Sequence, residues 1–227
     1  MALKDQISLF FRWLVKKTFP NRIRRILSAD SGQRKLKMPV LETERLVLRQ
    51  LHQDDLRDII AWEEVTWAQN TDVAAQEFLD YCFREYRDRG IGPWGIQLKK
   101  TGAIVGNCGF PHIIFKNLCG EVNCYIASRH RGHGLAGEAL QALFLWGFRD
   151  IGLTRIQARC ETDNLSSQRL AQKAGMRFEG WIESGPSSKD SGPKQKLYAI
   201  HGHDFNKVNN GIVDRTMNMT VYSDDRS

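Results

Sequence analysis

The stretch "RHRGHGLAGEAL", from Arg129 to Leu140, decides how the rest of the sequence is interpreted. It places glycines at 132, 134 and 137 immediately ahead of a segment with helical apolar periodicity. Glycines let a backbone curl so that several N–H groups point at one spot, and the next helix adds the positive end of its dipole. The pattern therefore predicts an anion site, and phosphate is an anion that such turns hold.

The spacing G-x-G-x-x-G by itself leaves two phosphates open, that of a dinucleotide such as NAD and the pyrophosphate of coenzyme A. A dinucleotide fold begins with this motif, directly after a strand and about 20 residues before an acidic side chain. Here the motif starts at Gly132, no β-α-β unit precedes it, and Ser128 to Arg131 separate it from the strand. Glu161 lies somewhat too far along. The sequence therefore disfavours a dinucleotide.

Hydrophobic periodicity around the turn predicts an α+β domain with the order β-α-α-β-β-β-α-β-α-β-β. "RLVLRQL" (45–51) alternates as a half-buried strand does, and "WGIQLKK" joins "AIVGNCGF" through Thr101-Gly102 as a hairpin. A doubly wound sheet would show strict β-α alternation instead. Further strands are expected at 121–127, 154–160, 177–183 and 194–200, and helices at 52–64, 72–90, 135–152 and 164–175.

Charge and patterning divide the 227 residues into three expected parts: a basic extension and linker (1–38), a main domain (39–206) and a polar tail (207–227). Residues 1–38 hold ten Lys and Arg against two Asp, a net of +8 within a total of +7. The remaining residues therefore sum to −1. A nucleic-acid-binding core would need a basic face of its own, so this class is disfavoured for the domain.

The extension contains "QISLFFRWLVKKTF" (6–19), which predicts an amphipathic helix. It could lie on an anionic membrane, dock on a protein partner or pack on its own domain. No small-residue cleavage site follows it, and no apolar stretch approaches the length of a membrane span. Five scattered cysteines indicate reduced thiols, so we expect a cytoplasmic protein, with a peripheral membrane position as the alternative. For Cys108, Cys119 and Cys124 a core position is favoured over metal binding.

Read one register earlier, Arg129-His130-Arg131-Gly132-His133-Gly134 is R-x-x-G-x-G, which resembles the acetyl-CoA signature of the GNAT superfamily of N-acetyltransferases. The resemblance extends over about residues 41–206. "ETERLVLRQLHQDDL", "EVNCYIASRHRGHGLAGEAL", "GFRDIGLTRIQARCETDNLSSQRLAQKAGMRFEG" and "LYAIHGHDF" are similar to successive blocks of the RimJ/RimL-like branch. The predicted element order is also that of the GNAT fold.

The resemblance implies that acetyl-CoA lies in a V-shaped split between two central strands and that no metal is needed. Strand "CYIA" would offer backbone groups to the pantetheine arm, and the amides from Arg131 to Gly137 would wrap the pyrophosphate, with Arg129 and Arg131 adding charge. His133 occupies a variable position of the motif. The implied cofactor-binding residues are Ile126, Arg129, Arg131, Gly132, His133, Gly134, Leu135, Ala136, Gly137 and Asn164.

The same resemblance implies two catalytic residues. Glu121 would take the ammonium proton of the acceptor, directly or through water, or else orient the acceptor or form a structural ion pair. Ser167, in the motif Asn164-x-x-Ser167, would protonate the departing thiolate. Many relatives in the wider superfamily use as the acid a tyrosine seven residues after this asparagine. This sequence has Ala171 at that position, which excludes a tyrosine acid there. Tyr198 is a weaker candidate acid, and the apolar neighbours of Cys124 favour packing over nucleophilic attack.

The function implied is an acetyl-CoA-dependent N-acetyltransferase in which a primary amine attacks the thioester directly in a ternary complex. The acceptor would be a protein N-terminus or a small-molecule amine. Two alternatives stay open, a catalytically silent coenzyme A-binding recruitment module and a membrane-surface enzyme anchored by residues 1–38. Acceptor specificity is expected in residues 63–71 and 184–194.

Overall fold

The computed structural model describes residues 36–62, 71–182 and 195–209. The predicted amphipathic helix at 6–19 lies outside these ranges, so its three alternative contacts, with a membrane, with a protein partner or with its own domain, stay open. So do most residues of the two segments in which acceptor specificity was expected. Within the described ranges, no helix is long and apolar enough to cross a bilayer.

The predicted α+β order is confirmed, with two short additions, strand β1 before it and helix α7 after it. Helix α7 runs across the expected boundary between the domain and the tail. The strands are β1 (Leu41–Glu42), β2 (Leu46–Arg49), β3 (Trp94–Leu98), β4 (Ile104–Ile114), β5 (Cys119–Ile126), β6 (Arg155–Glu161), β7 (Arg177–Ile182) and β8 (Gln195–His201). The helices are α3 (Leu56–Ile60), α4 (Thr71–Arg89), α5 (Leu135–Trp146), α6 (Leu165–Lys173) and α7 (Gly202–Asn209).

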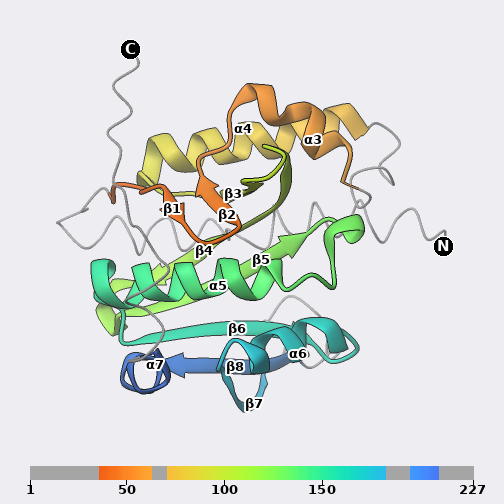
Figure 1. Ribbon diagram of the computed structural model, residues 1–227. Helices are drawn as coiled ribbons and strands as arrows, with labels where there is room; N and C mark the ends of the chain where they lie inside the picture. The colour runs from red at the N-terminus through yellow and green to blue at the C-terminus, as the bar shows by residue number, and fades with distance from the viewer. Residues whose placement is uncertain (1–35, 63–70, 183–194, 210–227) are drawn as a thin grey trace, which may run out of the picture.

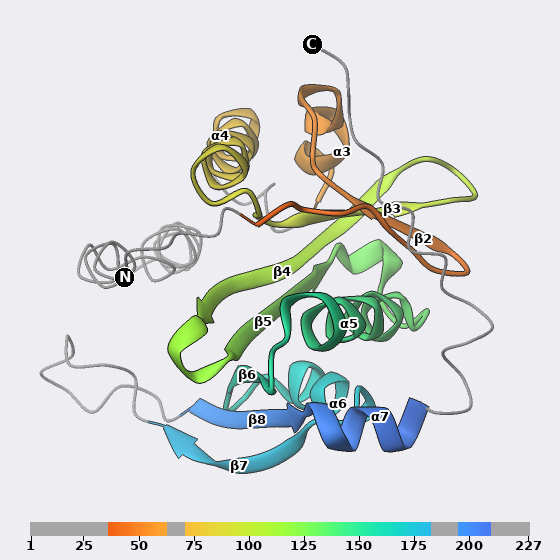
Figure 2. The same ribbon diagram turned by 90° about the vertical axis from the view of Figure 1, so that its left-hand side faces the viewer.

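One mixed sheet carries all these strands in the order β1-β2-β3-β4-β5-β6-β8-β7. Every neighbouring pair is antiparallel except β5 and β6, which are parallel. Helices α3 and α4 lie over one face of the sheet, and α5 lies on the other (Figures 1 and 2). We refer to these as the α4 face and the α5 face.

Strands β5 and β6 stay together for only three residue pairs, the last of which is Glu121 with Gln157. Beyond that pair β5 continues to Ile126 along β4, and β6 continues to Glu161 along β8. The two strands therefore separate in the middle of the sheet. This divergence is the split that the family resemblance implied.

Two hydrophobic clusters hold the sheet between its helices. On the α5 face, the ring centroids of Trp94 and Trp146 lie 5.0 Å apart, edge to face. On the α4 face, Trp62 packs 5.9 Å from Phe78, and its Nε1 donates to the carbonyl of Ile104. Each fully buried aromatic ring contributes a few kcal/mol, about 25 cal/mol per Å² removed from water. Strand β4 contributes buried side chains to both clusters and is therefore packed on both faces.

The end of α5 differs from the expected regular helix over 135–152. A wider π-helical turn, Gly147–Ile151, follows α5 and stops at Gly152, whose φ is 81°. A Cβ placed on Gly147 would lie 3.1 Å from both Ile156 and Phe110. Close packing of this turn against the sheet therefore favours glycine at 147, which periodicity alone does not indicate.

A buried ion pair fixes the chain between β2 and α3. Both guanidinium Nη atoms of Arg49 donate to the two carboxylate oxygens of Asp55 at 2.8 Å, and the backbone N–H of His52 donates to the same carboxylate. Burial by itself would raise the pKa of Asp55, but these hydrogen bonds and the charge of Arg49 hold it below its ordinary value of 3.8. The ionised carboxylate therefore stabilises the fold.

We expect Asp55→Asn to lower the free energy of unfolding by about 2 kcal/mol at neutral pH, because Arg49 then lacks its buried partner. The folded-state pKa is depressed, so this stabilisation is present above about pH 4 and is lost as the pH falls through the folded pKa. Urea unfolding of the wild type and of Asp55→Asn, at several pH values between roughly 3 and 7, measures the difference in their free energies of unfolding. A constant difference across that range would contradict the assignment.

Candidate functional site

The glycine turn lies at the open end of the split, between the end of β5 and the start of α5. Gly132 and Gly134 both have left-handed backbones, with φ of 82° and 77°. Gly134 is the N-cap of α5 and brings no side chain to the first amides of the helix. A Cβ on Gly132 would meet nothing within 4 Å. The turn thus combines uncapped N–H groups, a helix dipole and free space, which together suit an anion.

A carboxylate in the first turn of α5 ties the glycine turn to the start of β2. Glu138 accepts hydrogen bonds from the Thr43 hydroxyl and from both the backbone N–H and the guanidinium of Arg45. Burial opposes ionisation of Glu138, but these bonds lower its pKa. Arg45 also donates to the carbonyl of His133 at 2.9 Å. This clamp of Thr43 and Arg45 on Glu138 fixes the turn and neutralises a negative charge beside the candidate anion site.

The edge of β5 that faces the split has backbone groups available for a ligand. The N–H of Ala127 donates to the Val105 carbonyl of the preceding strand. Since backbone groups of successive residues point to opposite edges of a strand, those of Ile126 and Cys124 point toward β6. Beyond the Glu121–Gln157 pair, β6 no longer meets them. A ligand that runs along this edge can pair with β5 as a strand would.

The two arginines of the motif have different surroundings. Arg131 donates from Nε to the Ile126 carbonyl at 2.7 Å, and its guanidinium lies 5.6 Å from the centroid of the Tyr125 ring. This side chain therefore shapes the turn. Arg129 donates to the neighbouring His130 ring, and both Arg129 and His133 are exposed. Leu135 is buried in the core, and Ala136 and Gly137 follow it in the first turn of α5.

The start of α6 lies at the C-terminal end of β6, on the other side of the split. The Asn164 side-chain oxygen accepts from the N–H of Ser167 at 3.0 Å and from the Ser166 hydroxyl at 2.8 Å. It thus caps the helix, as its residue type favours. The cap places Ser167, which is half-buried, in the first turn of α6.

Glu121 sits where β5 and β6 part. Its Oε2 accepts from Arg159 at 3.0 Å and from Gln157 at 3.2 Å, both on β6. The carboxylate side chain keeps 18% of its accessible surface. Glu121 is therefore both a bridge between the two arms and an accessible carboxylate on the α4 face. The polar row continues from Gln157 to Arg155 and on to Glu179 of β7.

The remaining sequence candidates are in the core. Burial raises the pKa of Cys124 to about 12, so its thiol stays protonated at neutral pH. Cys124 lies opposite Cys108 in the ladder between β4 and β5, and all five cysteines are free. Tyr198 is buried and packs against the ring of Phe178. Across the described ranges, no three His, Cys, Asp or Glu side chains are arranged as a metal site.

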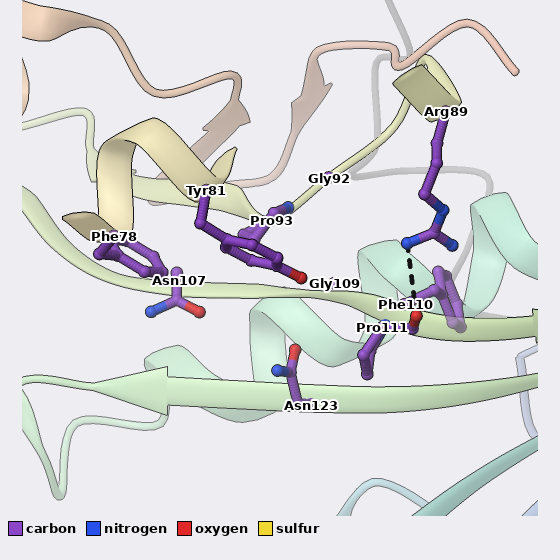
Figure 3. Close-up of a pocket in the computed structure, with 10 residues that line it drawn as sticks. All are labelled: Phe78, Tyr81, Arg89, Gly92, Pro93, Asn107, Gly109, Phe110, Pro111 and Asn123. Carbon is purple, nitrogen blue, oxygen red and sulfur yellow. Dashed lines mark hydrogen bonds between the residues drawn. The ribbon is translucent and has the colours of Figure 1, made fainter. Parts of the chain in front are cut away.

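A cavity of about 30 Å³ lies between α4 and the strands β4 and β5 (Figure 3). Phe78, Tyr81 and Arg89 reach it from α4, and Asn123 reaches it from β5, two residues beyond Glu121. The sequence did not single out these four residues. They lie far apart in the chain, and the pairing of β4 with β5 under α4 brings them together.

The acetyltransferase (GNAT) domain family matches residues 45–177. The chain belongs to the GNAT acetyltransferase family. It is 33% identical over 151 residues to the uncharacterized N-acetyltransferase YoaA of Bacillus subtilis (strain 168), covering 63% of this chain and 85% of that one. The ribosomal-protein-serine acetyltransferase of Escherichia coli (strain K12) is 28% identical over 100 residues, 44% of this chain and 56% of the relative.

The solved structures agree on the fold. The GNAT-family acetyltransferase from Bacillus anthracis superposes with a TM-score of 0.61 at 24% identity, over 72% of this chain and 99% of that one. The chain is thus an acetyltransferase of the GNAT fold, and enzymes of this fold use acetyl-CoA. The glycine turn, the free space at Gly132 and the open edge of β5 are features that suit such a molecule.

Replacing Gly132 tests the anion site without filling an occupied space. We expect Gly132→Asp to weaken acetyl-CoA binding at least about 10-fold, because it adds negative charge beside the pyrophosphate. Gly132→Asn has nearly the same shape without the charge and should weaken it much less. Isothermal titration of both variants with acetyl-CoA gives the comparison.

The matched control is Gly102→Asp, because Gly102 also has a φ of 77° but lies in the turn between β3 and β4. It carries the same backbone strain and the same added charge. If Gly102→Asp weakens binding as much as Gly132→Asp, the effect reflects stability, and the turn is not the anion site.

Proposed function

We propose that this chain is an acetyl-CoA-dependent N-acetyltransferase in which a primary amine attacks the thioester directly, in a ternary complex. The observation that carries the proposal is the divergence of β5 and β6 immediately after Glu121, with the glycine turn at its open end. One continuous path then leads from the glycine turn, along the edge of β5 that faces the split, to a carboxylate on the opposite face of the sheet. Acetyl-CoA supplies the acetyl group as a reactive thioester.

The chain's own contribution begins with positioning. The amides of residues 131–137 would hold the pyrophosphate, and the backbone of Ile126 and Cys124 would hold the pantetheine arm. Backbone dipoles aimed at the thioester carbonyl stabilise the charge that develops on its oxygen. The clamp of Arg45 and Glu138 keeps these amides in place before binding, so little ordering is left to do.

Two side chains would handle protons. Glu121 faces the acceptor side, where it would bind the incoming ammonium and draw off its proton directly or through water. Ser167, held in the first turn of α6 by the Asn164 cap, would give a proton to the departing sulfur. The ion pair of Glu121 with Arg159 fixes the carboxylate at the point where the strands part.

The relatives indicate the class of the acceptor amine and not its identity. The similarity to an enzyme named for acetylating a ribosomal-protein serine supports the RimJ/RimL-like branch and, with it, a protein N-terminus as acceptor. A small-molecule amine is the second candidate. The cavity beside Asn123 is lined by aromatic rings, amide groups and the guanidinium of Arg89, and it would hold only a small group next to the attacking nitrogen.

Acetyl transfer is tested by incubating the full chain with acetyl-CoA and a panel of amines, including peptides with N-terminal Ser or Ala, a polyamine and an aminoglycoside. Release of the coenzyme A thiol gives the rate, and mass spectrometry identifies the acetylated amine. We expect Ser167→Ala and Glu121→Gln each to lower kcat about 100-fold while acetyl-CoA affinity stays within about 2-fold, because both side chains move protons.

Ser166→Ala is the matched control for Ser167, since it removes a hydroxyl from the same turn of α6. It should retain wild-type kcat. A protein that binds acetyl-CoA but transfers to none of the amines would instead support a silent coenzyme A-binding module. Equal losses in the two serine variants would remove Ser167 from its proposed role.

A further inference from the structure

A bulge in β4 brings a histidine opposite Glu121. In the ladder between β4 and β5, Gly109 lies opposite Asn123, and the next matched pair is His112 with Glu121. Strand β4 therefore has one residue more than β5 between these two pairs, which is a β-bulge. Without the extra residue Pro111 would lie opposite Glu121. Directly opposite residues of an antiparallel pair share one face, so the bulge places His112 on the α4 face with Glu121.

The local sequence accounts for this bulge. Pro111 lacks a backbone N–H and cannot donate to a ladder, so proline inside a sheet is confined to edges and bulges. The C-terminal end of α4 holds the bulge in place, because Arg89 donates to the Pro111 carbonyl at 3.3 Å (Figure 3). Arg89 is in turn fixed by Glu85 at 2.7 Å. The backbone directly before His112 is thus anchored to the C-terminal end of α4.

Three charged groups act on His112 from the elements around it. They are Glu121 on β5, Arg89 on α4 and Arg159 on β6, and Glu85 pairs with Arg89. Burial lowers the pKa of His112 from its ordinary value of 6.5, Glu121 opposes this, and the two arginines reinforce it. The imidazole is therefore mostly neutral at neutral pH, and a neutral imidazole carries one unprotonated ring nitrogen.

Glu121 by itself is poorly placed to keep a proton. Its Oε2 already accepts from Arg159 and Gln157, and a proton that stayed on this carboxylate would leave Arg159 without its anionic partner. A neutral imidazole on the same face offers the proton a second site. The ion pair across the split can then re-form before the products leave.

We propose that His112 is the final proton acceptor of the transfer: Glu121 draws the proton from the bound ammonium and passes it, directly or through water, to the imidazole. This inference rests on the proposed function. His112 acts through Glu121 and does not contact the reacting atoms.

The step balances. The ammonium N–H bond breaks, and its proton ends on His112, which becomes an imidazolium. The neutral amine nitrogen forms a bond to the acetyl carbon, and the carbon–sulfur bond breaks. The new amide nitrogen loses a second proton, which reaches the sulfur through the Ser167 hydroxyl. His112 then releases its proton to solvent.

The first test is the pH profile of the full chain. We expect kcat of the wild type to rise through an apparent pKa at or below about 6.5, since only neutral imidazole accepts a proton. His112→Gln should lower kcat about 100-fold at pH 7 and remove this limb, with acetyl-CoA affinity unchanged. His203→Gln replaces an exposed histidine of α7 and should keep the wild-type profile. A limb that persists in His112→Gln overturns the proposal.

The second test needs no acceptor. NMR titration of the His112 ring in the folded wild type should place its pKa below 6.5, and Glu121→Gln should lower it further, since the carboxylate opposes the effect of burial. A His112 pKa that does not respond to Glu121→Gln would show that the two groups do not communicate, and this alone overturns the relay. If the His112 pKa responds to Glu121→Gln but no amine is acetylated, the proposed function has failed, and the relay fails with it.

Discussion

The whole site depends on how briefly β5 and β6 pair. Three parallel residue pairs join the two strands, and then each continues with its own antiparallel neighbour, β4 on one side and β8 on the other. Continuous antiparallel ladders leave no backbone group exposed, whereas this separation leaves the edge of β5 open inside the sheet. An open edge would normally invite association with another strand. Here α5 covers one face of the opening (Figure 2), and the bridge of Glu121 with Arg159 and Gln157 spans its narrow end.

Charge is arranged around this opening in compensated pairs. Glu138 would repel a pyrophosphate at the start of α5, but Arg45 neutralises it and fixes the turn in the same contact. Where β5 and β6 part, Arg159 neutralises the carboxylate of Glu121 and fixes its position. The attraction for an anion then comes mainly from backbone amides and the helix dipole. This arrangement is consistent with a domain that carries almost no net charge apart from its basic extension.

Local patterns were sufficient to predict most of the fold. Alternation at 45–51 and helical periodicity at 135–148 depend on near neighbours, so they are readable from one sequence. The left-handed glycines of the turn follow from the motif itself. The clamp of Arg45 on Glu138 joins residues 93 positions apart, and no local pattern marks it. Pro111 was a readable signal, since proline inside a strand of eleven residues indicates a bulge, but its effect on His112 requires the register. The roles of Glu121 and Ser167 stay predictions.

The short junction between β5 and β6 also has a consequence for the lifetime of the protein. The sheet consists of two blocks joined by three residue pairs and by the packing of α5. A ligand seated between the blocks would connect them, and any molecule that binds only the folded state stabilises it in proportion to the logarithm of its concentration. The resistance of the folded chain to proteolysis would then follow the supply of its own acetyl donor. Through the open edge that admits the ligand, the amount of enzyme in the cell would then rise and fall with the concentration of the acetyl donor.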